Sequence, residues 1–200
     1  MGSQHSSDRG ERGTDLPPKS APGGDAAGAK PEPVPPAKEL PPPEKPALSV
    51  ERLTHLDVNE VCGLYKKVWD AQRADLSPEM VKAWEPTPLE FTSWMEGVTY
   101  FAARRNGRLV GVVGLETSHG SGRFVHLAVE PEGRRQGVAT ALIRTTIEWA
   151  KKNGCASVWA DTLARFTSAA QLLKHLDFEE SGVLHRHEWS EDVRFFERLL

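Results

Sequence analysis

The sequence predicts a mixed α/β domain, a mostly antiparallel sheet with helices on both faces, which follows a tail without regular structure. Three observations predict it. All 15 aromatic residues lie in residues 48–200. In that part, segments of alternating hydrophobicity interleave with segments of helical spacing. An Asn-Gly pair at 106–107 joins two alternating segments, which is typical of a β-hairpin.

Residues 1–47 hold 11 of the 15 prolines, six of the 17 glycines and no aromatic residue. Such a segment cannot bury enough apolar surface to offset its ordering entropy, so we predict a disordered, semi-stiff spacer. Two P-x-x-P patterns, Pro33–Pro36 and Pro43–Pro46, leave open a docking partner for this tail. The opening Met-Gly-Ser-Gln-His-Ser also fits the weak N-myristoylation pattern.

Composition excludes several classes of protein. The net charge of −3, from 25 basic and 28 acidic residues, argues against nucleic-acid binding by bulk electrostatics. The sequence contains no run of 18 apolar residues, so we expect no membrane span. It shows no apolar leader, so we expect no secretion signal. Two cysteines, Cys62 and Cys155, are too few for a four-ligand zinc site, so no metal is expected. They indicate reduced core thiols in a cytoplasmic protein.

The elements are predicted in order from residue 48. Residues 48–54 alternate as a strand does, and Asp57 with Glu60 resembles a capping box for a helix that runs to Trp69. The remaining elements are expected to be helices at 77–84 and 87–96, strands at 98–105, 108–117 and 123–130, a helix at 137–152, a strand at 156–162, a helix at 167–176, and strands near 180–187 and 192–199.

The segment from Phe124 to Leu142, FVHLAVEPEGRRQGVATAL, carries the chemistry. A strand ends before Pro131, and a helix opens a few residues later at Gly137. First-turn N–H groups have no intrahelical partner, and the helix dipole adds positive potential at the same place. Gly137 lets an anion approach the backbone, and two arginines add charge. This segment therefore predicts a phosphate-binding cradle.

The pattern L-A-V-x-P-x-x-R-x-x-G-x-A resembles the acetyl-CoA-binding motif of the GCN5-related N-acetyltransferases (GNAT). Here it is carried by Leu127, Ala128, Val129, Pro131, Arg134, Gly137 and Ala139. The order of elements over 48–200 matches that family as well. The resemblance implies that strands 123–130 and 156–162 splay apart and that pantetheine bonds to the backbone between them. It also implies a pyrophosphate in the cradle. The implied cofactor-binding residues are Leu127, Ala128, Val129, Arg134, Arg135, Gln136, Gly137, Val138, Ala139 and Thr140.

The implied reaction is direct attack of a primary amine, on a small molecule or a protein, on acetyl-CoA in a ternary complex. Four residues are candidates for the catalytic base. Asp161, near the end of its strand, matches the place of a strand carboxylate in some ribosomal-protein N-terminal acetyltransferases of the family. His126 precedes the Leu127 segment and has a suitable ordinary pKa. Glu116 ends the preceding strand, and Glu130 lies on the same face as His126.

The sequence departs from the family pattern in the helix 167–176. The place of a family Tyr is taken by Leu173, the place of an Asn by Phe166 and that of a Gly by Asp177. Leu173 cannot protonate a leaving thiolate, whereas Asp177 can adopt a left-handed helix cap. The alternative function is therefore an acyl-CoA-binding module without transfer activity. The acceptor and a homodimer stay open.

Overall fold

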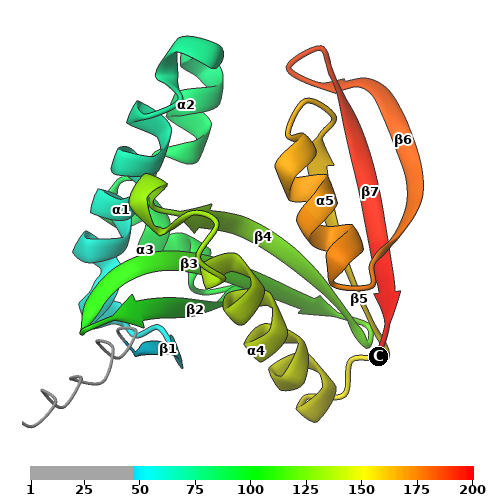
Figure 1. Ribbon diagram of the computed structural model, residues 1–200, viewed down its shortest axis with the longest axis horizontal. Coiled ribbons are helices and arrows are strands. Elements are labelled where there is room, and N and C mark those ends of the chain that lie inside the picture. Colours follow the sequence, from blue (N-terminus) through cyan, green and yellow to red (C-terminus); the bar gives the residue numbers. More distant parts are fainter. Residues whose placement is uncertain (1–46) are drawn as a thin grey trace, which may run out of the picture. The chain divides into compact units, whose positions relative to one another are not determined.

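The computed structural model describes residues 47–200. These residues form one seven-stranded sheet with the strand order β1-β2-β3-β4-β5-β7-β6 (Figure 1). The strands are β1 (Leu48–Arg52), β2 (Val98–Arg105), β3 (Arg108–Ser118), β4 (Ser121–Val129), β5 (Ser157–Leu163), β6 (Glu179–Glu188) and β7 (Glu191–Leu199). The α-helices are α1 (Val58–Asp70), α2 (Pro78–Trp84), α3 (Pro88–Trp94), α4 (Val138–Lys152) and α5 (Thr167–His175).

The predicted fold class and order of elements are confirmed. The β2–β3 hairpin turns at Asn106 and Gly107, both with positive φ, as the Asn-Gly pair predicts. One local prediction is wrong. Asp57 makes no side-chain bond to the first turn of α1; instead it accepts from Thr54 and from Arg104. Glu60 accepts from the backbone N–H of Leu109, so it anchors α1 to β3 rather than closing a capping box.

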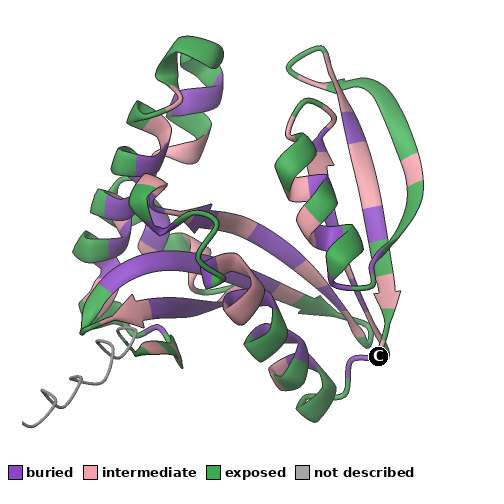
Figure 2. Cartoon of the chain, viewed as in Figure 1, coloured by how far each residue is buried: buried purple, intermediate pink, exposed green. Residues whose placement is uncertain are grey.

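The helices cover the sheet in two unequal layers. On one face α4 and α5 bury a cluster that includes Leu142, Ile147 and Leu173 with Phe196 of β7. On the other face α1 and α3 pack over the strands up to β4, where Val61 and Phe91 meet Tyr100 and other buried residues. Figure 2 shows the buried positions along β3 and on the inward side of α4. On this second face, Met80 and Val81 of α2 also pack against Leu163 of β5 and Val193 of β7.

The sheet opens between β4 and β5. These parallel strands pair only from Ser121–Phe124 to Ser157–Ala160, whereas β4 continues along β3 to Val129 and β5 continues along β7 to Leu163. The two strands meet near the carboxyl terminus of the chain and then diverge (Figure 1). The predicted splay of 123–130 from 156–162 is thus present, and it leaves the end of β4 without a neighbour on one side.

The predicted tail, with its P-x-x-P patterns and its myristoylation pattern, lies outside the described residues, so the boundary at 47/48 stays a prediction. Cys155 is buried and Cys62 is half-buried, and the two are not joined. Within residues 47–200, no helix combines the length and the apolar character that a membrane crossing requires.

Candidate functional site

The loop between β4 and α4 exposes an array of backbone N–H groups. Gly137 stands at the N-cap of α4 with φ of +79°, and Arg135 is also left-handed with φ of +59°. The first intrahelical bond runs from Ala141 N to Gly137 O, and no side chain caps the helix. The N–H groups of Val138, Ala139 and Thr140 are therefore free to bind an anion.

Side chains of the loop hold this backbone in place. The amide of Gln136 accepts from the Arg105 guanidinium at the end of β2 and donates to Glu132 O at 2.5 Å. Arg134 donates from Nε to Val129 O at 3.4 Å. The side chain of Gln136 thus fixes the loop. Arg135 is exposed, and it forms no ion pair with another residue of the described range 47–200.

The end of β4 turns backbone groups into the gap. Glu130 N donates to Val110 O, so the alternation of an antiparallel ladder directs the N–H and C=O of Val129 away from β3. Leu127 has no direct partner on β3, whereas Ala128 pairs with Val112 and its side chain is buried. The predicted strand segment therefore lies at the edge of the gap, next to the α4 cradle.

A second group of predicted residues gathers where β4 and β5 begin to part. Arg123 donates to Oδ1 of Asp161 from Nε at 3.1 Å and from Nη2 at 2.9 Å. Its Nη1 lies 3.7 Å from Glu116, its cross-strand neighbour on β3. The guanidinium also lies over the ring of Trp159, 4.9 Å from the centroid. Sequence reasoning named both carboxylates but missed the arginine that joins them.

His126 lies on the same face of the sheet, inside a β-bulge. Between the pairs Val112–Ala128 and Gly114–Val125, β4 has one residue more than β3, and His126 adopts φ of +56°. Its Nδ1 lies 2.6 Å from the Tyr100 hydroxyl. Burial, and to a smaller extent Arg123, lowers the pKa of His126 to about 4. The imidazole is therefore neutral at pH 7.

Two tyrosines hold this bulge. Tyr65 of α1 donates to His126 O at 2.8 Å, and Trp94 of α3 stacks on the imidazole at 4.2 Å. Burial raises the pKa of both Tyr65 and Tyr100, so both hydroxyls keep their protons. Both tyrosines are buried in the core, and neither helical spacing nor strand alternation carries a signal for their polar contacts to a bulge.

Other candidate residues have different surroundings. The Glu130 carboxylate is buried and accepts from Arg108 at 2.5 and 2.7 Å and from Lys67 at 3.0 Å, so its oxygens are committed to structural ion pairs. Leu173 lies on α5, and its side chain is buried in the core between this helix and the sheet. Asp177 has φ of +61°, which confirms the predicted left-handed cap.

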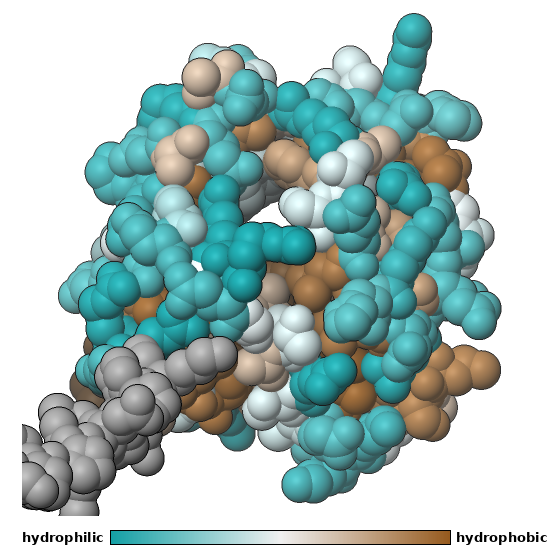
Figure 3. Space-filling model, in the orientation of Figure 1, coloured by the Kyte–Doolittle hydropathy of each residue, from teal (hydrophilic) through white to brown (hydrophobic). Residues whose placement is uncertain are grey.

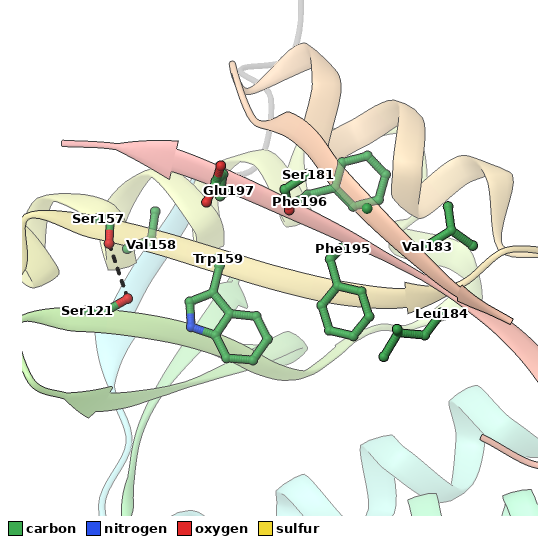
Figure 4. A pocket seen from close by; sticks show the side chains of 11 residues that line it. Ser121, Ser157, Val158, Trp159, Ser181, Val183, Leu184, Phe195, Phe196 and Glu197 are labelled. Atoms are coloured by element: carbon green, nitrogen blue, oxygen red, sulfur yellow. Dashed lines mark hydrogen bonds between the residues drawn. The ribbon is translucent and has the colours of Figure 1, made fainter. Parts of the chain in front are cut away.

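A groove of about 520 Å³ runs over the sheet next to Asp161 (Figure 4). Phe195 pairs with Asp161 across β5 and β7, and its side chain points to the same side as Trp159 and Leu184. Ser121 and Ser157 bond to each other at 3.2 Å at one end. Figure 3, in the same orientation as Figure 1, shows a separate hollow beside α5, with hydrophilic residues on one wall and apolar residues at its floor.

Comparison with known proteins places these features in one family. The profile described as the Acetyltransferase (GNAT) family matches residues 69–178. The human protein N-acetyltransferase 8B is 33% identical over 100 residues, which are 47% of this chain and 44% of that protein. The [ribosomal protein bS18]-alanine N-acetyltransferase of Escherichia coli strain K12 is 26% identical over 94 residues, 47% of this chain and 64% of that protein. The chain thus matches less than two thirds of either relative.

Solved structures share the fold. The ribosomal-protein-S18-alanine N-acetyltransferase of Escherichia coli superposes with a TM-score of 0.64 at 19% identity, covering 76% of this chain and 94% of that one. The PaiA N-acetyltransferase of Thermoplasma acidophilum, in complex with coenzyme A, gives 0.65 at 14% identity and covers 77% and 99%. With the splayed strands, the helix cradle and a family profile that spans more than half of its residues, this chain belongs to the acetyltransferase (GNAT) family.

Proposed function

We propose that this protein is an acetyl-CoA-dependent N-acetyltransferase that moves an acetyl group to a primary amine. One observation carries the proposal: the gap between β4 and β5 and the free N–H groups of α4 lie at the same end of β4. A long ligand with an extended arm and a pyrophosphate fits such an arrangement, because the arm needs strand-like partners and the phosphates need N–H donors.

In this proposal, different residues bind the pantetheine arm and the pyrophosphate of acetyl-CoA. Leu127 offers backbone groups to the pantetheine arm, and Val129 offers its N–H, since its carbonyl accepts from Arg134. The N–H groups of Gly137, Val138, Ala139 and Thr140 receive the pyrophosphate. Arg134 and Arg135 are exposed beside them and contribute positive charge, while Gln136 holds the loop through Arg105. Ala128 acts indirectly, because its burial against α1 fixes the strand.

In the proposed reaction, acetyl-CoA supplies a thioester and the acceptor supplies a neutral amine. The amine nitrogen forms a bond to the carbonyl carbon, the carbon–sulfur bond breaks, and sulfur leaves with the electron pair as a thiolate. The extra proton on nitrogen passes to a base. Holding the two reactants together accounts for much of the rate, and the base adds roughly 10²–10⁴-fold.

The acidic residues of the cluster are the proposed bases. Arg123 binds only Oδ1 of Asp161, which leaves Oδ2 for a proton. Glu116 is the alternative, and its side chain is more exposed than that of Asp161, at 43% against 17%. The groove beside Asp161 brings an acceptor with an apolar group next to its amine onto Trp159 and Phe195.

An acyl-CoA-binding module remains the second candidate, because Leu173 offers no proton to the thiolate. The thiolate then leaves as an anion or takes a proton from water. Neither a homodimer nor a docking partner for the tail has an observation in its favour among the described residues.

A CoA-release assay across small amines and peptides with free N-termini tests the proposal. We expect release of CoA that depends on both acetyl-CoA and one acceptor class. Binding of acetyl-CoA without release for any acceptor would favour the module instead.

A further inference from the structure

We propose that Tyr100 is a positioning residue that fixes His126 in its Nε2–H tautomer, so that His126 acts as a hydrogen-bond donor and not as the base. The proposal deepens the proposed function, and its catalytic part rests on it. The tautomer itself is a property of the protein without substrate.

The contact between the two side chains leaves one place for the hydrogen. The Tyr100 hydroxyl lies 2.6 Å from Nδ1, so one of the two atoms donates and the other accepts. Tyr100 is only 2% exposed, and within residues 47–200 its hydroxyl has no other partner. If Nδ1 carried the hydrogen, the phenolic hydrogen would be buried without an acceptor. The phenol therefore donates, Nδ1 accepts, and the hydrogen of the neutral ring lies on Nε2.

The surroundings keep the imidazole in this orientation. Tyr65 holds the backbone carbonyl of His126, and Trp94 stacks on the ring at an interplanar angle of 23°. The Tyr100 ring is nearly parallel to the imidazole, at 8°. Nε2 has no hydrogen-bond partner among the described residues. It is also not one of the polar side-chain atoms there that are fully buried without a partner. The donor is therefore accessible.

Charge favours a neutral ring with a single hydrogen. Burial and the nearby Arg123 disfavour the imidazolium, and Asp161 opposes them only in part, so the pKa of His126 is lowered. A neutral Nε2–H group does not remove a proton from an ammonium, because its lone pair on Nδ1 is bound to Tyr100.

The donor has a use in the transfer step. Negative charge develops on the thioester oxygen while the amine attacks, and an aimed N–H group stabilises that charge. The hydrogen stays on Nε2 throughout, the leaving electron pair goes to sulfur, and the proton of the amine goes to Asp161 or Glu116. His126 thus donates a hydrogen bond to the thioester oxygen, and one of the two carboxylates accepts the proton of the amine nitrogen.

NMR of the imidazole ¹⁵N nuclei in the full chain, at pH 7 and without substrate, tests the assignment. We expect a protonated Nε2 and an unprotonated Nδ1 in the wild type. Tyr100→Phe should yield a mixture of tautomers, whereas the control Tyr65→Phe, which loses only the bond to His126 O, should keep the wild-type pattern. A wild type with Nδ1–H, or a Tyr100→Phe variant with the wild-type pattern, would overturn the proposal.

Two substitutions test the role in catalysis. The Gln side chain can place an N–H near the position of Nε2, whereas Asn can place one only near Nδ1. We expect His126→Gln to retain kcat within about tenfold of wild type and His126→Asn to lose about 100-fold or more. Equal losses in both would overturn the donor role. If the wild type itself transfers no acetyl group, the proposed function fails, and the NMR pattern still decides the tautomer.

Discussion

Arg123 of β4 donates two hydrogen bonds to a single carboxylate oxygen of Asp161 on β5, at 2.9 and 3.1 Å. Strand pairing ends at Phe124 and Ala160, so this link lies where the gap between the two strands begins. The second oxygen of Asp161 stays free of Arg123. The pair therefore links the two strands at the root of the gap and leaves Oδ2 of Asp161 available for the proton transfer proposed above.

Asp161→Asn should remove the base and keep the shape of the side chain. We expect kcat to fall roughly 10²–10⁴-fold, as for loss of a general base, with acetyl-CoA affinity within about threefold of wild type. Steady-state kinetics and calorimetry measure the two quantities. Glu116→Gln is the matched control, since its carboxylate lies 3.7 Å from the same guanidinium. A larger loss in Glu116→Gln than in Asp161→Asn would transfer the role of base to Glu116.

Gly137 and Gly154 offer a matched pair of substitutions at opposite ends of α4. Both have φ near +80°, at +79° and +83°, and a Cβ at either would meet nothing within 4 Å. Valine at either position should cost about 1–2 kcal/mol of stability from the left-handed backbone alone. Only Gly137→Val should also weaken acetyl-CoA binding, by about tenfold or more, because its side chain enters the cradle. Equal affinities of the two variants would refute the cradle.

Glu130→Gln should destabilise the fold without affecting the reaction. The buried carboxylate accepts three bonds from Arg108 and Lys67, and an amide of the same shape accepts fewer of them. We expect a loss of about 1–3 kcal/mol in the free energy of unfolding, measured by urea denaturation. Glu132→Gln is the control: Glu132 also contacts Lys67 but its side chain is 63% exposed, so no measurable change is expected. A lower kcat in Glu130→Gln, with acetyl-CoA affinity equal to that of the wild type, would make Glu130 a candidate base again.

Protonation of His126 should make the free energy of unfolding fall as the pH is lowered below about 6.5. Its pKa is about 4 in the folded chain against 6.5 ordinarily, so the unfolded chain binds its proton first as the pH falls. The contribution of the neutral ring is complete above pH 6.5 and is lost between about pH 6.5 and 4, with a maximum of about 3 kcal/mol. Comparing the free energy of unfolding of wild type and His126→Gln across this range isolates the effect. Parallel curves for the two proteins would show that His126 has an ordinary pKa.

Much of the fold follows from local sequence patterns. The elements from 48 to 200 appear within a few residues of their predicted bounds, because alternation, helical spacing and the Asn106-Gly107 turn all act locally. The left-handed conformation of Asp177 was also predictable, since this residue follows the end of α5.

The arrangement of the candidate site could not be predicted in the same way. Arg123, Glu116 and Asp161 come from three strands, and only the register of β3, β4 and β5 brings them together. The bulge at His126 depends on an extra residue in β4 that the alternation of 123–130 does not reveal. The expected cap at Asp57 failed for a similar reason, because Arg104, 47 residues away, competes for its carboxylate.

Calorimetric titration of acetyl-CoA into the full chain tests the proposed cofactor site most directly. We expect saturable binding of one molecule per chain, retained in Gly154→Val and weakened about tenfold or more in Gly137→Val. Ligand at about 100 times its Kd should also stabilise the fold by about 2.7 kcal/mol. Absence of both heat and thermal stabilisation with the wild type at millimolar acetyl-CoA would contradict the site.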